Sequence, residues 1–289
     1  MKKDAWGFVS GVSVARETSF LPQRFMDELA ATPPAEAAVR LGRTWFGPAD
    51  PLTLFDAFAR QRRDREFDDI EKLSPASWPV DLLRIRFATD EVRKGIDSVP
   101  DGADGTELAR SLVRLSVRAG RYAEQFAEQF SSPLPRPGAS ARLAASLLVD
   151  SAELEITYKI ADLADDEILA RYAEARAQAA SAKVALRALK LGIPREDLAS
   201  FFFRGRLITE RARGFLNDYR EAAALALLPE GCSPGTEDDF LLSVAAQSKG
   251  NAFSAARVLY YLLGFLQQER HLRLAVYSSL GRLPGKEAA

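Results

Sequence analysis

The chain has 289 residues, of which 47% are apolar and 27% charged, and its formal net charge is −1. A balance so close to neutrality gives no electrostatic case for nucleic acid or for an anionic membrane surface as a partner. The single cysteine, Cys232, excludes an internal disulfide and any zinc site built on cysteines, and a reducing cytoplasmic setting fits this usage. The apolar share is ample for a sizeable core, in one large unit or several small ones.

The N-terminal stretch and the apolar runs predict no direct membrane insertion. Lys2 and Lys3 could open a signal peptide, but Asp4 follows them, and glycines and serines interrupt the next stretch. The longest apolar run near the C-terminus, Val258–Leu266, is far shorter than the roughly 18–20 residues needed to cross a bilayer. We therefore expect a protein that is not integral to a membrane, although it could sit against a membrane protein.

Helix-forming residues dominate the chain, and no segment sustains the apolar–polar alternation, rich in Val, Ile and Thr, that is typical of a strand. The predicted fold class is all-α. Ser131–Gly138, with three prolines and a glycine, is the clearest linker. Residues 139–191 lack Gly and Pro, which favours two or more long helices. We predict helices at about 5–20, 22–31, 34–46, 52–73, 78–96, 105–130, 139–162, 165–191, 194–203, 206–228, 237–247 and 251–281.

An internal repeat links three of these helices, which can be aligned without gaps. The aligned stretches are Arg84–Ile96, Ser181–Ile193 and His271–Leu283. A basic residue occupies one common position in all three copies, as Arg86, Lys183 and Arg273. Each basic residue lies next to an apolar seam, where its stem can pack while its charge reaches water.

The apolar seam and a glycine keep the same register in the repeat. Gly95 aligns with Gly192, and the third copy carries Gly281 one place earlier. The seam residues recur in steps of three and four, which places them on one helix face: Trp78, Leu82, Ile85 and Val92; Ile168, Tyr172, Ala175, Ala179, Ala182, Leu186 and Leu189; and Val258, Leu262, Phe265, Leu272 and Val276. The copies are too far apart for a simple solenoid, so we predict three helical modules, 1–100, 101–203 and 204–289, with the first and last helices sharing a bundle.

The middle segment, Tyr172–Phe203, resembles the C-type subunits of V/A-type rotary ATPases (ATP synthases), whose eukaryotic counterparts are the d-type subunits of the V-ATPase. The family pattern is a long helix ending in a leucine- and arginine-rich run, then Leu-Gly, then a short acidic helix. The matching positions are Lys183, Leu186, Arg187, Ala188, Leu191 and Gly192. The C-terminal segment Gln267–Pro284 is similar at Glu269, Leu272, Arg273, Leu280, Leu283 and Pro284. The N-terminal stretch Trp6–Gly47 is similar in plan.

The resemblance implies a funnel of three helical modules with pseudo-threefold symmetry and a non-catalytic coupling role. A protein of this family sits on the membrane rotor ring, holds the foot of the central stalk and transmits torque for ATP-coupled proton or sodium transport. The implied partners are the central-stalk subunits and the rotor ring, with no cofactor, metal, nucleotide or nucleic acid. The implied location is cytoplasmic, peripheral to the membrane through a membrane-embedded partner.

The candidate partner-contact residues are the charged groups of the repeat and one aromatic run. Equivalent helices around an axis present equivalent faces to it, so Arg86, Lys183 and Arg273, with Glu269 and His271 beside the last, could line a socket for the stalk. The alternative is that these residues pair within their own modules. The run of Phe201, Phe202 and Phe203 predicts either a contact patch or core packing between modules.

Two other functions remain open. One is a generic all-helical scaffold or adaptor. The other is a Mg²⁺-dependent isoprenoid synthase, because Asp64 and Asp68 stand four apart on a predicted helix, as do Asp162 and Asp166 if that region is helical. Carboxylates so paired could hold Mg²⁺ against a diphosphate. The alternative is that the first pair belongs to a solvated charged face and that the second pair brackets a helix start.

Overall fold

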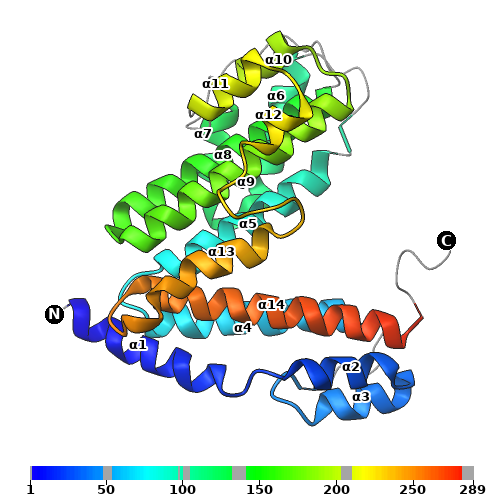
Figure 1. Cartoon of the computed structure of the whole chain (residues 1–289), viewed down its shortest axis with the longest axis vertical. Helices are drawn as coiled ribbons and strands as arrows, with labels where there is room; N and C mark the ends of the chain where they lie inside the picture. Colours follow the sequence, from blue (N-terminus) through cyan, green and yellow to red (C-terminus); the bar gives the residue numbers. More distant parts are fainter. Residues whose placement is uncertain are drawn as a thin grey trace. The chain divides into compact units, whose positions relative to one another are not determined.

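The computed structural model describes residues 2–47, 54–96, 98–99, 105–131, 141–202 and 210–281. Every regular element within these ranges is a helix, so the prediction of an all-α fold is confirmed. The chain divides into two compact units (Figure 1): unit 1 comprises Met1–Val80 and Ser248–Ala289, and unit 2 comprises Asp81–Gln247. This division differs from the three predicted modules, 1–100, 101–203 and 204–289, whose threefold relation stays a prediction.

Unit 1 is built around the last helix of the chain. Its helices are α1 (Lys2–Glu17), α2 (Gln23–Ala31), α3 (Pro34–Gly42), α4 (Phe55–Leu73) and α14 (Ala255–Ser279). All four earlier helices pack against α14, which extends across the width of the unit in Figure 1, above α1 to α3. The expectation that the first and last helices share a bundle is therefore confirmed.

The core of unit 1 contains the seam predicted for the third copy of the repeat. Val258, Leu262, Phe265, Leu272 and Val276 on α14 are all fully buried. Around the last two residues gather apolar side chains of the N-terminal helices and of the segment between α3 and α4: Met26, Leu29, Ala37, Leu41, Phe46, Phe55 and Ala59. Burying each large side chain contributes roughly 1.5–3 kcal/mol, so the seam holds α2, α3 and α4 on α14.

Unit 2 is a continuous stretch of chain with a long helical hairpin at its centre. Its helices are α5 (Trp78–Ile96, which begins in unit 1), α6 (Gly105–Ser116), η2 (Val117–Tyr122), α7 (Ala123–Phe130), α8 (Ala141–Ala164), α9 (Glu167–Lys190), α10 (Arg195–Phe202), α11 (Glu210–Asn217), α12 (Glu221–Leu225) and α13 (Glu237–Ala246). The hairpin turns at Asp165, whose φ is 49°, a left-handed conformation that Asp tolerates better than most residues. Asp166 then caps α9, accepting hydrogen bonds from the amides of Ile168 and Leu169.

Two of the predicted helices are broken. The predicted helix 105–130 is interrupted by η2, where Gly120 has φ 59° and ψ −120°, a conformation open to glycine but not to residues with a Cβ. The predicted helix 206–228 is interrupted between α11 and α12, where Asp218–Arg220 lie outside both helices. In both places the apolar periodicity continues across the break, so periodicity alone did not reveal it.

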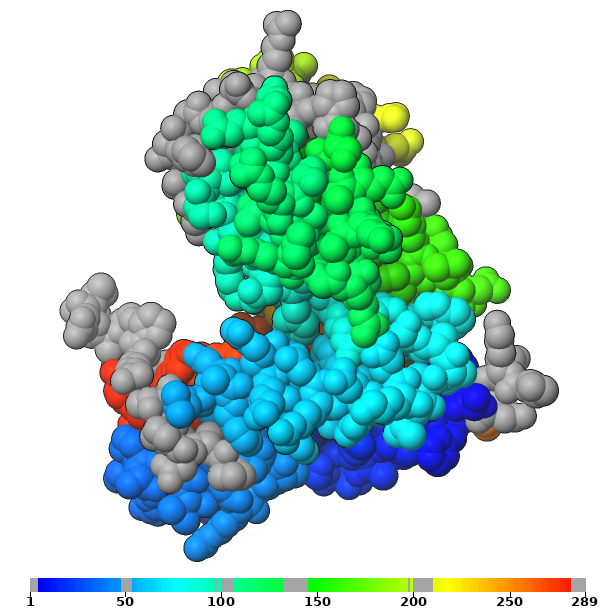
Figure 2. Space-filling view, turned by 180° about the vertical axis from the view of Figure 1, so that it is seen from behind, coloured from blue at the N-terminus to red at the C-terminus, as the bar shows by residue number. Residues whose placement is uncertain are grey.

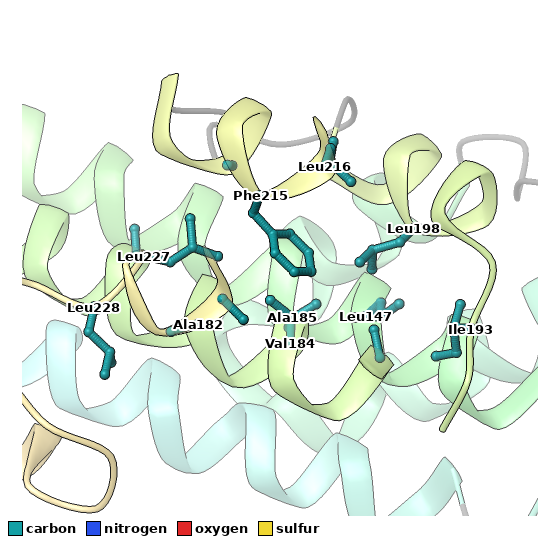
Figure 3. Close-up of a cluster of buried hydrophobic side chains, with 14 of the residues drawn as sticks. Leu147, Ala182, Val184, Ala185, Ile193, Leu198, Phe215, Leu216, Leu227 and Leu228 are labelled. Carbon is teal, nitrogen blue, oxygen red and sulfur yellow. The ribbon is translucent and has the colours of Figure 1, made fainter. Parts of the chain in front are cut away.

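The core of unit 2 depends on the small side chains of α9. Seven alanines of this helix are buried, and they let neighbouring helices approach closely: Ala173, Ala175, Ala177, Ala179, Ala182, Ala185 and Ala188. Figure 3 shows the Phe215 ring of α11 pointing toward Ala185 and Val184 on α9, with Leu227 and Leu198 on either side of it. The contacts hold the short helices α10 to α12 on the hairpin.

Candidate partner-contact surfaces

The first two basic residues of the repeat both contact the start of α13. The Arg86 guanidinium on α5 donates to a carboxylate oxygen of Asp238 at 2.9 Å. The Lys183 ammonium on α9 lies 3.4 Å from a carboxylate oxygen of Glu237. Glu237 and Asp238 are neighbours in the first turn of α13, where the helix dipole already favours negative charge. Arg86 and Lys183 therefore hold one end of α13 from two different helices.

The electrostatics of Glu237 match this arrangement. Burial alone would raise the pKa of its carboxyl group. The backbone amides of Glu237 and Gly235, together with Lys183, favour the charged form more strongly, so the pKa is lowered. The Glu237 carboxylate is thus ionised where it meets Lys183, and the contact is an ion pair rather than a neutral hydrogen bond.

The third basic residue of the repeat pairs in a similar way within unit 1. Arg273 on α14 donates to Asp56 at 2.9 Å and to Glu269 at 2.9 Å. Asp56 lies in the first turn of α4. Each of the three repeat-equivalent basic residues thus pairs with a carboxylate in the first turn of another helix, and each pair lies within one unit. The alternative to a stalk socket was pairing within a predicted module, and these three pairs instead join different predicted modules. Only the second contact of Arg273, with Glu269, stays within its own predicted module.

Glu269 and His271 differ in their access to solvent. Glu269 is buried, and one of its carboxylate oxygens lies 2.9 Å from Arg273 and 3.7 Å from Arg63. Its other carboxylate oxygen has no hydrogen bond among the described residues. Burial raises the pKa of this carboxyl group, although Arg63 and Arg273 act against the shift. Glu269 is therefore a core group, whereas His271 is half-buried and reaches the surface.

The aromatic run lies at the edge of what the structure describes. The helix α10 ends at Phe202. The side chains of Phe201 and Phe202, and the whole of Phe203, lie outside the described residues. Their role in contact or in packing stays a prediction.

The acidic pairs behind the isoprenoid synthase hypothesis have different environments. Asp64 and Asp68 are exposed on α4, four residues apart as expected. Asp162 lies in the last turn of α8, whereas Asp166 is the cap of α9, so the second pair does not share a helix face. In the part of the chain that the structure describes, no three His, Cys, Asp or Glu side chains are grouped so as to hold a metal ion.

A buried ion network in unit 2 was not predicted from the sequence. Glu153 on α8 accepts two hydrogen bonds from Arg176 on α9, at 2.7 and 3.1 Å. Arg93 on α5 pairs with Asp150 and lies 3.6 Å from Glu153. Burial raises the pKa of Asp150, although Arg93 opposes the shift, and Glu153 keeps the pKa of Arg176 high in spite of its burial. The sequence signal for this network was the presence of three acids, Asp150, Glu153 and Glu155, within an otherwise apolar stretch of α8.

Comparison with protein-family models and with curated proteins finds no match for this chain. Proposals about its function therefore depend on its own residues. Among the described helices, none combines the length and the apolar character that crossing a membrane requires.

Proposed function

We propose that this protein is a non-catalytic coupling component of a V/A-type rotary ATPase. In this role it links the central-stalk subunits to the membrane rotor ring and transmits torque for ATP-coupled proton or sodium transport. It works without a cofactor, in the cytoplasm, and reaches the membrane only through the ring. The proposal starts from the family resemblance of residues 172–203 and 267–284.

The observation that carries the proposal is the common setting of Arg86, Lys183 and Arg273. Each lies on a long helix with a largely buried apolar seam, and each pairs with a carboxylate in the first turn of another helix. Three modules of common descent would each keep a basic residue beside a buried apolar seam and paired with a helix start. The family resemblance implies such a threefold repeat of helical modules. The support is structural, since it concerns the build of the modules and not a bound partner.

The partial exposure of these basic residues also suits a coupling role. The side chain of Lys183 is 50% exposed and that of Arg273 is 37% exposed. The acidic partners Asp238 and Asp56 are about half exposed as well. Exposed ion pairs contribute about 0–1 kcal/mol, so an incoming carboxylate can replace either of these two partners at little cost. Charges of this kind guide docking and increase the association rate, and they make the association sensitive to salt.

Retention of purified central-stalk subunits on the immobilised protein tests the proposal. The variant Arg86→Ala/Lys183→Ala and the matched variant Glu237→Gln/Asp238→Asn break the same two internal pairs. If the basic residues also bind the stalk, the first variant should lose about tenfold in affinity, or about 1.4 kcal/mol, and the second should bind as well as the wild type.

Two results would count against the proposal in different ways. Failure of the wild-type protein to bind either the stalk subunits or the isolated rotor ring would contradict the coupling function and favour the generic scaffold. Binding that is equal for both variants would keep the function but place the stalk socket away from Arg86 and Lys183.

A further inference from the structure

Exposed arginines recur along α6 and into η2. Arg110, Arg114 and Arg118 follow one another in steps of four and are all exposed, whereas Leu108 and Leu112 on the inner face are fully buried. The outer surface of α6 and α7 is part of the face of unit 2 seen in Figure 2, in teal. The helix is therefore strongly amphipathic, with a core face of leucines and an outer face of guanidinium groups.

The charges of this row are not balanced locally. No carboxylate of the described residues forms an ion pair with Arg110, Arg114 or Arg118. The next arginine is different, because Arg121 donates to Asp81 at 3.2 Å. Between residues 105 and 121 the sequence has four arginines and a single acid. A chain that is neutral as a whole thus carries a locally basic surface, which attracts negatively charged partners.

Two exposed valines extend the row of arginines on one side. Val113 is 38% exposed and Val117 is 73% exposed, although valine is among the residues most often buried. They stand four residues apart, next to the arginines on the same outer face of the helix. A scattered exposed valine needs no explanation. A pair aligned with three arginines forms a surface that is basic along one edge and apolar along the other.

We propose that Arg110, Arg114, Arg118, Val113 and Val117 form a docking surface for an acidic amphipathic helix of a partner protein. Arg110 and Arg114 are separated along α6 by about 6 Å, which is four times the helical rise per residue. Arg118 follows in η2, and its guanidinium group lies near Gly95 of α5. Carboxylates spaced four residues apart on a partner helix repeat at the same distance. The planar guanidinium group suits a carboxylate, with which it forms two parallel hydrogen bonds. Apolar residues beside those carboxylates would cover the two valines.

A membrane surface fits these observations less well. A basic residue near an anionic bilayer contributes about 1 kcal/mol, and stable attachment needs a second strong signal such as a large apolar face or a lipid chain. Two valines do not provide such a face. The spacing of Arg110 and Arg114 along α6 instead matches another helix. This inference goes beyond the coupling role and does not depend on it, because it concerns a different surface of the protein.

Binding of a synthetic peptide to the full-length protein tests the inference. The probe is a fluorescently labelled helical peptide of about 16 residues, with glutamates in steps of four and leucines beside them. Its partner is the wild-type protein, the variant Arg110→Gln/Arg114→Gln/Arg118→Gln, or the matched variant Arg43→Gln/Arg60→Gln/Arg65→Gln, which removes three exposed arginines of unit 1. Glutamine keeps the helix propensity, and circular dichroism verifies that each variant is folded.

We expect the first variant to lose at least tenfold in affinity and the matched variant to bind as the wild type does. A peptide with glutamine in place of glutamate should bind at least tenfold more weakly, and Val117→Asn should weaken binding several-fold. Three results would overturn the inference: no binding of the acidic peptide to the wild-type protein, equal binding by both arginine variants, or tighter binding of phosphatidylserine vesicles than of the peptide.

Discussion

Removing Glu153 should destabilise unit 2 severely, because it leaves a buried guanidinium without its carboxylate. The Glu153 side chain is 3% exposed and the Arg176 side chain is 12% exposed. One oxygen of Glu153 accepts both hydrogen bonds from Arg176, at 2.7 and 3.1 Å. In Glu153→Ala that charge would stay in the core between α8 and α9, where no other group of the described residues accepts these two hydrogen bonds in the same geometry.

The expected loss follows from what happens to the charge that remains. Breaking a buried ion pair by removing one partner costs about 3–5 kcal/mol. For a domain of 150–250 residues, each kcal/mol lowers Tm by about 2–4 °C, so Glu153→Ala should lower Tm by about 6–20 °C. The double variant Glu153→Leu/Arg176→Met removes both charges and restores apolar volume. It should cost far less than the two single changes added together.

The positions of the tryptophans make this prediction measurable for unit 2 alone. Trp6, Trp45 and Trp78 are all the tryptophans of the chain, and all belong to unit 1. Circular dichroism follows the helices of both units, whereas the fluorescence of Trp6 and Trp45 follows unit 1, and the two units need not unfold together. Trp78 begins α5, which continues into unit 2, so Trp78→Phe makes the fluorescence specific for unit 1. Glu153→Ala should therefore lower a dichroism transition more than the fluorescence transition.

A matched change on the same helix supplies the control. Glu155 is less buried than Glu153 and is two residues further along α8, so Glu155→Ala should cost under about 1 kcal/mol. If Glu153→Ala were no more costly than Glu155→Ala, or if the double variant lost as much as the sum of the single ones, the reasoning about a trapped buried charge would be refuted.

Two further predictions concern a helix end and a pH dependence. Gly192 follows α9 with φ +63°, so Gly192→Ala should lower the free energy of unfolding by about 1–2 kcal/mol. Gly214 lies inside α11 with open space around it, so Gly214→Ala should raise the free energy of unfolding by about 0.5–1 kcal/mol. Thermal unfolding measures both changes, and equal effects would contradict the prediction. The lowered pKa of Glu237 means that its stabilising contribution is present above the ordinary glutamate pKa of about 4.3 and is lost as pH falls through the folded-state value. Lys183→Met should reduce the loss of stability on acidification, because Lys183 helps to lower this pKa. An unchanged dependence of Tm on pH would contradict the prediction.

The long helices could be predicted because their signals are local. The predicted helix 78–96 matches α5, and the seam predicted for 251–281 is the buried face of α14. Both depend on apolar spacing within a few turns, which the sequence states directly. The cap of α9 also had a local signal, since Asp166 stands immediately before the first helical residue.

The partners of the charged residues could not be predicted, because they depend on tertiary packing. Arg86 meets Asp238 across 152 residues of sequence, and nothing near either residue specifies the other. The burial of Glu269 was missed for the same reason, since its neighbour Arg63 belongs to a distant helix. The break at Gly120 had a weak signal, a glycine within a periodic segment, and glycine alone does not decide between a helix and a turn.

Unit 1 is assembled from both ends of the chain, and this has a consequence during synthesis. The amide of Leu21 donates to the side chain of Gln268, and Ser279 donates to the carbonyl of Thr32. At 5–20 residues per second, the ribosome needs roughly 10–40 s to go from the end of the first segment to the last helix. Unit 2 is continuous and can fold during that interval. The helices α1 to α4 must wait with their apolar faces uncovered, so chaperones that hold nascent chains would find their target there.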